Sequence, residues 1–272
     1  MEKLNSQINF LIDYLLKEAS EIVDYKDENF KNKFSLYKSL CNIRQPYNIS
    51  NEFLEKEKEF FTEYNKTRNI QEVDSIKPLG EAFPNITNQY KNKLVLWQGD
   101  ITTLKADAIV NAANSQGLGC FVPSHICIDN LIHTYAGVAL RLECNEVMKK
   151  IDYNLETGKA IITSAQNLPS KYVLHTVGPI IQSRVSESKI NDLANCYRNC
   201  LKLAQEHSIK SIAFPCISTG LFRFPQALAC EIAIKTTIEY LDTHDNNFEK
   251  IIFNVFGDKD LEIYREYIQK NL

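Results

Sequence analysis

The feature that most restricts the fold of this chain is an alternation of short apolar runs with helical patterns, which begins near residue 93 and continues to the C-terminus. Six runs rich in Val, Ile, Leu and aromatic residues predict strands at 93–98, 107–112, 159–165, 172–177, 211–216 and 250–255. Apolar residues recur at helical spacing at about 130–150, 189–207, 225–243 and 259–272. This alternation predicts an α/β domain in which a mixed, largely parallel sheet of six to seven strands lies between two layers of helices.

The first 90 residues differ from this pattern and are predicted to be helical. Apolar residues recur at helical spacing in three stretches, at 4–15, 30–41 and 53–64. Ser50 is suited to be the N-cap of the third helix. We expect residues 1–90 to form a helical extension packed on a main domain of residues 91–272, with 76–92 as the connection; the alternative is that its aromatic stripes bind a partner.

Charge and composition exclude several classes of protein. The 272-residue chain has 31 basic and 34 acidic residues without a dense basic stretch, so we expect no nucleic-acid partner. It has no apolar run near 18 residues and no basic, apolar leader, so we expect no membrane association. Its eight cysteines then indicate reduced thiols and a cytoplasmic location.

Three potential metal ligands follow the second predicted strand. Cys120, His125 and Cys127 form a C-x4-H-x-C array in a loop, and two thiolates with one imidazole suit Zn²⁺. No fourth ligand is close in the sequence, and a site with three protein ligands leaves a position for water or substrate. The alternative is that both cysteines pack as small apolar side chains; the triplet alone does not decide between the two.

Three motifs in order resemble the macrodomain family of ADP-ribose binders: Gly99-Asp-Ile-Thr102, Asp107-Ala-Ile-Val-Asn-Ala-Ala-Asn114 and Pro215-Cys-Ile-Ser-Thr-Gly-Leu-Phe222. The family's glycine run followed by V-D-G-A-I-H is absent. In its place stand Cys120 to Cys127 and then Ile128-Asp-Asn-Leu-Ile-His133, which is similar to the zinc-containing subfamily of bacterial hydrolases that remove ADP-ribose from protein. The resemblance implies a macrodomain fold and Zn²⁺ as cofactor.

The resemblance also implies the residues of an ADP-ribose site. Asp100 would accept a hydrogen bond from the adenine amino group, and Asn114 would bind the distal ribose. The flat apolar face of Phe256 is suited to stack on adenine; the alternative is that Phe256 is a core aromatic residue at a strand end. Amides of the turn after the fifth strand, with Gly220 allowing close approach, would hold the diphosphate without a cation. The full expected set is Asp100, Ile101, Ala113, Asn114, Cys127, Ile128, Asp129, Ser218, Thr219, Gly220, Leu221, Phe222 and Phe256.

The activity implied is zinc-dependent hydrolysis of the bond between the distal ribose and an aspartate or glutamate side chain of a modified protein. Asn114 and Asp129 are the expected catalytic residues, Asp129 by activating or orienting water. The metal would orient a ribose hydroxyl, polarise the leaving carboxylate or activate water, and these choices stay open. Relatives of this kind pair with a sirtuin-like transferase and a lipoyl-carrier protein. The alternatives are an ADP-ribose reader with a structural zinc and a hydrolase of O-acetyl-ADP-ribose.

Overall fold

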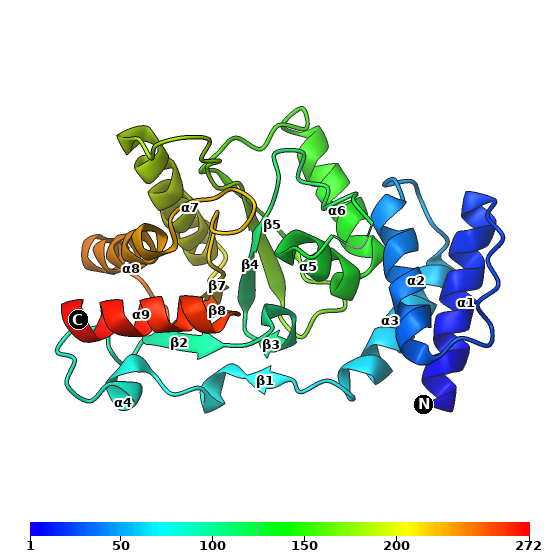
Figure 1. Cartoon of the computed structure of the whole chain (residues 1–272), viewed down its shortest axis with the longest axis horizontal. Helices are drawn as coiled ribbons and strands as arrows, with labels where there is room; N and C mark the ends of the chain where they lie inside the picture. Colours follow the sequence, from blue (N-terminus) through cyan, green and yellow to red (C-terminus); the bar gives the residue numbers. More distant parts are fainter. Residues whose placement is uncertain (124) are drawn as a thin grey trace.

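The computed structural model describes residues 1–123 and 125–272 and is built around one six-stranded sheet (Figure 1). Neighbouring strands are parallel except for the last pair, in which β5 is antiparallel to β6. The strands in spatial order are β2 (Leu94–Gln98), β8 (Lys250–Val255), β7 (Ser211–Phe214), β4 (Ala108–Ala112), β6 (Tyr172–Thr176) and β5 (Ala160–Ser164). The predicted mixed, largely parallel sheet is therefore confirmed.

Helices cover both faces of the sheet, which explains why the strands are nearly continuous apolar runs. Alternate residues of a strand point to opposite faces: Ala108 and Val110 belong to one core, and Ile109 belongs to the other. The first core is covered by α7 (Glu187–Glu206), α8 (Gln226–Thr243) and α9 (Asp258–Asn271), and the second by α5 (Ile128–Ala136) and α6 (Val138–Lys149). The result is the predicted three-layer arrangement.

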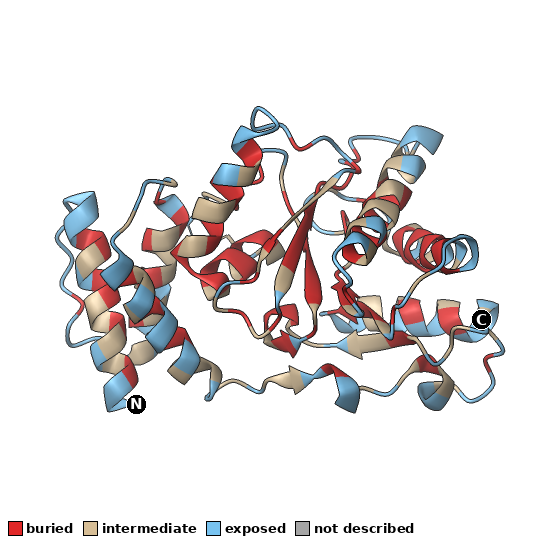
Figure 2. Cartoon of the chain, turned by 180° about the vertical axis from the view of Figure 1, so that it is seen from behind, coloured by how far each residue is buried: buried red, intermediate tan, exposed pale blue. Residues whose placement is uncertain are grey.

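Three helices precede this domain and form a core of their own. They are α1 (Glu2–Ala19), α2 (Phe30–Ile43) and α3 (Asn51–Asn65), as the apolar periodicity predicts. Ser50 is the N-cap of α3, since its hydroxyl accepts a hydrogen bond from the Phe53 amide at 3.2 Å. Val138 of α6 is part of the same core, so the helices pack on the α5/α6 side of the domain. Their outward sides are exposed and their inner sides are buried (Figure 2).

The chain between α3 and β2 runs along one side of the molecule and carries elements that the sequence did not predict (Figure 1). These are the short helices η1 (Val73–Ser75) and α4 (Leu79–Ala82) and the two-residue strand β1 (Gln71–Glu72), which pairs in parallel with β3 (Leu104–Lys105). Strands of two residues are too short to show a period of apolar residues. Within 1–123 and 125–272, no helix has both the length and the apolar character needed to cross a membrane.

Candidate functional site

A pocket of about 420 Å³ opens where the loops after β4, β7 and β8 converge. This is the carboxyl edge of the parallel strands, where ligands of open α/β sheets bind. Thirteen of the residues expected from the sequence line it: Ala113, Asn114, Cys120, His125, Cys127, Ile128, Asp129, Ser218, Thr219, Gly220, Leu221, Phe222 and Phe256. The structure thus brings together the metal-ligand array and most of the predicted ligand-binding residues.

The turn after β7 lines the pocket with residues 218–222. The turn is closed by a hydrogen bond of 3.0 Å from the Phe224 amide to the Ser218 carbonyl, and Ser218 adopts a positive φ of 66°. Among the described residues, no acceptor pairs with the amides of Gly220, Leu221 and Phe222. A side chain added at Gly220 would project into open space, so a ligand can approach the backbone here. Such a group of oriented N–H groups binds anions.

No Lys or Arg is found among the residues that line the pocket in the described chain. An anionic ligand must therefore be held by amides and helix ends rather than by cations. The N-terminus of α5 supplies the second group of amides, because Ile128 and Asp129 form its first turn and line the pocket.

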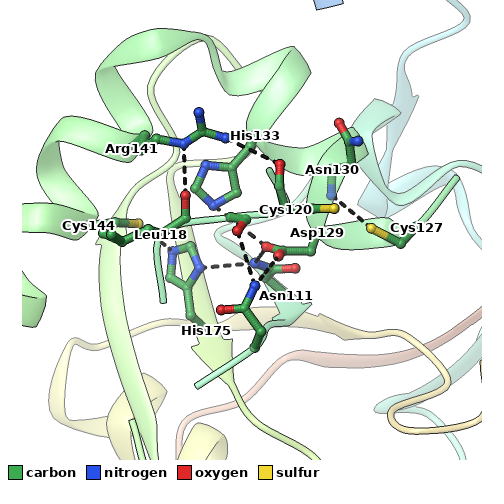
Figure 3. Close-up of polar contacts among 12 residues, drawn as sticks. Asn111, Leu118, Cys120, Cys127, Asp129, Asn130, His133, Arg141, Cys144 and His175 are labelled. Carbon is green, nitrogen blue, oxygen red and sulfur yellow. Dashed lines mark hydrogen bonds and ion pairs between the residues drawn. The ribbon is translucent and has the colours of Figure 1, made fainter. Parts of the chain in front are cut away.

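Asp129 is buried at the floor of the pocket and is held by two asparagines. Asn111 of β4 donates to one carboxylate oxygen at 2.7 Å (Figure 3). Asn114 donates to the other at 3.4 Å. Burial raises the pKa of Asp129 to about 6, which the Asn111 hydrogen bond and the charge of Arg141 oppose. His133 lies one helical turn later, with its Nε2 3.6 Å from an Asp129 carboxylate oxygen, and neither of its two buried ring nitrogens forms a hydrogen bond within the described chain.

The predicted metal ligands converge at the rim of the pocket. The donor atoms of Cys120, His125 and Cys127 all lie within 4.8 Å of one another, and Cys120 Sγ is 3.4 Å from His125 Nδ1. In a tetrahedral zinc site, Zn–S and Zn–N bonds of about 2.3 and 2.0 Å separate neighbouring donors by roughly 3.5–3.8 Å. The donor set and its spacing therefore fit Zn²⁺ after small movements of the side chains.

Cys127 also begins α5, since its Sγ accepts a hydrogen bond of 3.4 Å from the Asn130 amide. Burial raises the pKa of the Cys127 thiol to about 12, and the charges of Asp129 and Cys120 add to this while the Asn130 amide opposes it. A cation next to these sulfurs would offset the cost of their negative charge, as thiolate ligation requires.

Two expected residues, Asp100 and Ile101, do not line the pocket in the described part of the chain. Asp100 is instead the N-cap of the short helix η2 (Ile101–Thr103), and its carboxylate also lies 3.2 Å from Arg68 Nη2. Ile101 is buried in the α5/α6 core. Capping η2 does not prevent Asp100 from also contacting adenine, so the adenine contact of Asp100 stays a prediction.

Several residues that line the pocket were not expected from the sequence. They are Ala112, Ile126, Gly178, Pro215, Cys216, Asn254 and Asp260. Gly178 follows β6, and the same strand-end argument that selected the turn after β7 would have found it. The sequence carries no comparable signal for Asp260, which reaches the pocket from α9.

The fold and pocket define an α/β domain with a pocket at the carboxyl ends of its strands, whose lining contains no Lys or Arg within the described residues. The chain belongs to the Macro domain family, whose sequence model matches residues 110–233. It is 43% identical to a protein from Staphylococcus aureus (strain MSSA476) named "Protein-ADP-ribose hydrolase", across 100% of this chain and 99% of that protein. A protein of the same name from Treponema medium is 46% identical, across 94% of this chain and 96% of that protein.

A solved structure is similar as well. The Trypanosoma brucei macrodomain in complex with ADP-ribose superposes with a TM-score of 0.66 at 26% identity, covering 85% of this chain and 94% of that one. The macrodomain fold expected from the sequence motifs is therefore confirmed.

Proposed function

We propose that this chain is a zinc-dependent hydrolase that removes mono-ADP-ribose from aspartate or glutamate side chains of modified proteins. The observation that carries the proposal is the convergence, in one pocket, of an amide-lined turn, a buried carboxylate and a Cys-His-Cys array. The names of the two bacterial relatives support the ADP-ribose chemistry. The zinc requirement rests on the three donor atoms that lie within 4.8 Å of one another.

The shape of the pocket suggests how ADP-ribose would lie. The diphosphate would bind between the free amides of the turn at Gly220 and the first turn of α5. Phe256, which is 76% exposed at the pocket, offers a flat apolar face for adenine. The distal ribose would then lie beside Asn114 and Asp129, next to the metal ligands.

The reaction adds water across the bond between the ribose anomeric carbon and the side-chain oxygen. The water oxygen bonds to the anomeric carbon, the carbon–oxygen bond to the protein breaks with its electron pair, and the protein carboxylate leaves. Asp129 would accept or orient the proton of the attacking water, while Asn114 holds Asp129 and contacts the ribose. When bound by Cys120, His125 and Cys127, Zn²⁺ would supply Lewis acidity at its open coordination position, which suits positioning of the ribose or of the leaving carboxylate.

The proposal extends to the identity of the modified protein. Following the resemblance to zinc-containing macrodomains, we propose a lipoyl-carrier protein that a sirtuin-like transferase has modified. Two thiolate ligands require a reducing compartment, so we propose the cytoplasm as the place of the reaction.

Release of ADP-ribose from an aspartate-modified protein, with and without a chelator, tests the proposal. We expect release that stops with the chelator and returns with Zn²⁺, and loss of zinc in the variants Cys120→Ala, His125→Ala and Cys127→Ala. Zinc content equal to wild type in all three variants would show that the metal site is wrong. Normal hydrolysis by zinc-free variants would show that the metal has only a structural role. Binding of ADP-ribose without any release would show that the protein is a non-catalytic ADP-ribose reader.

A further inference from the structure

Arg141 of α6 is a buried cation whose partners are main-chain carbonyls rather than carboxylates. It is 6% exposed, and no acidic side chain forms a salt bridge with it in the described residues. Its guanidinium donates to five carbonyl oxygens: Leu118 at 2.8 Å, Cys120 at 3.5 Å, Cys41 at 2.6 Å, Asn42 at 3.1 Å and Arg44 at 2.6 Å. These acceptors belong to two segments that are about 80 residues apart in the sequence: the loop that carries the proposed metal ligands (residues 115–123 and 125–127, called the metal loop below) and the end of α2.

The end of α2 is chemically suited to this role. Cys41 and Asn42 are in its last turn and Arg44 is its C-cap. The carbonyls at the end of a helix have no amide partner within the helix and need other donors. The C-terminal end of a helix also carries the negative pole of its dipole. Arg141 therefore closes the end of α2 and, with the same guanidinium, holds the backbone at Leu118 and Cys120 (Figure 3).

Asn42 makes a second connection from α2 to the metal loop. This buried side chain donates to the carbonyl of Cys120 at 3.0 Å and to Asn130 Oδ1 at 2.7 Å. Asn130 in turn donates to the carbonyl of His125 at 3.0 Å. The main chain of two of the three metal ligands is thus held by side-chain hydrogen bonds that begin in the N-terminal helices.

We propose that the N-terminal helices are part of the active site, with Asn42 and Arg141 as positioning residues that hold Cys120 and His125 in metal-binding geometry. The proposal rests on the zinc site proposed above. The metal loop has no helix or strand of its own in residues 115–123 and 125–127, so its geometry depends on such side-chain bonds. Removal of outer-shell hydrogen bonds to metal-ligating side chains lowers metal affinity by about 10- to 100-fold, and we expect an effect at the low end of this range for bonds to the main chain of the ligands.

The test compares Asn42→Ala and Arg141→Lys with a matched control, Asn65→Ala. Asn65 of α3 also donates from Nδ2 to a carbonyl of the main domain, that of Asn167 at 3.0 Å, but lies outside the metal loop network. Each full-length protein is measured for Zn²⁺ affinity by chelator competition, for the absorption spectrum with Co²⁺, and for metal-free thermal unfolding. The Co²⁺ bands report ligand geometry, which a loss of general stability would leave unchanged.

We expect Asn42→Ala and Arg141→Lys to bind Zn²⁺ about 10-fold or more weakly and to have altered Co²⁺ bands. The control should lose a similar amount of stability and keep wild-type affinity and bands. Wild-type affinity and bands in Asn42→Ala, or equal losses in the control, would overturn the positioning role while leaving the zinc site intact. Failure of the wild-type protein to bind either metal would overturn both proposals. Arg141→Lys can unfold because it removes several hydrogen bonds, and Asn42→Ala then decides the outcome alone.

Discussion

Glu57 should make the stability of this protein depend on pH between about 5 and 7. This carboxylate of α3 is 1% exposed and lies between the N-terminal helices and the main domain. It accepts a hydrogen bond of 2.5 Å from the Tyr37 hydroxyl and bonds of 3.0 and 3.2 Å from the Val138 amide. Val138 is the first residue of α6, and Gly137 before it has no side chain to cap the helix. Glu57 therefore serves as the missing cap from another helix.

Burial raises the pKa of Glu57 from 4.5 to about 7, although the hydrogen bonds from Tyr37 and Val138 oppose the rise. Below pH 4.5 the group is protonated in both folded and unfolded chains, so it adds no pH dependence there. Between 4.5 and 7 the folded protein keeps a proton that the unfolded chain has lost, and stability falls as pH rises. The free energy of unfolding falls by about 1.36 kcal/mol per pH unit in this range, so the total loss is about 3 kcal/mol at pH 7 and stays constant at higher pH.

Glu57→Gln should remove this loss, because an amide stays neutral and can still accept from the Val138 amide. The measurement is urea unfolding at pH 5, 6, 7 and 8 for wild type, Glu57→Gln and Glu55→Gln, an exposed position on the same helix. Between pH 5 and pH 8, the free energy of unfolding of Glu57→Gln should increase relative to that of wild type by up to about 3 kcal/mol. The control Glu55→Gln should show the same pH dependence as wild type. Parallel curves for Glu57→Gln and wild type across this range would refute the argument from burial.

Three further substitutions have distinct expected outcomes. Asp129→Asn should lower kcat by about 100-fold or more while the Kd for ADP-ribose changes little, which turnover and calorimetry separate; an unchanged kcat would contradict its role with water. Gly220→Val adds a side chain that projects into the open pocket, so we expect an unchanged Tm. The Kd for ADP-ribose should rise about 10-fold, equivalent to about 1.4 kcal/mol of binding free energy. An unchanged Kd would show that the diphosphate does not bind at this turn. Gly137→Ala introduces a β-carbon at a φ of 86° and against the Glu57 carboxylate, and we expect the free energy of unfolding to fall by about 2 kcal/mol or more; a urea midpoint equal to wild type would contradict this.

The sheet could be predicted from the sequence because both of its faces are buried. Each strand is a compact apolar run between turns; the predicted runs differ from β2, β4 and β6 by only one residue at an end, and the last predicted run coincides with β8. The apolar periodicity of α1 to α3 was equally clear because one side of each helix faces a shared aromatic core. The paired strands β1 and β3 carry no such signal, since two residues make no pattern.

The pocket was predictable to the extent that its residues follow strands. The register of β4 places Asn111 and the residues after it at the carboxyl edge, and the turn after β7 reaches the same edge. Cys120, His125 and Cys127 were found because their chemistry is unusual, not because their positions could be derived. Asn42 and Arg141 were missed, since an Asn on one helix and an Arg on another carry no signal in the sequence that links them to the metal loop.

This difference has a physical origin that bears on how the site works. A side chain at a strand end is positioned by the ladder of main-chain hydrogen bonds, which tolerates many substitutions. A ligand in an irregular loop has no ladder, and its backbone must be held by side chains from elsewhere, here from α2 through Asn42 and from α6 through Arg141. Substitutions far from the pocket in sequence should therefore disturb metal binding more than substitutions within the sheet beneath it. If the proposed positioning role of Asn42 holds, α2 belongs to the same functional unit as the pocket, because Asn42 holds the main chain of Cys120.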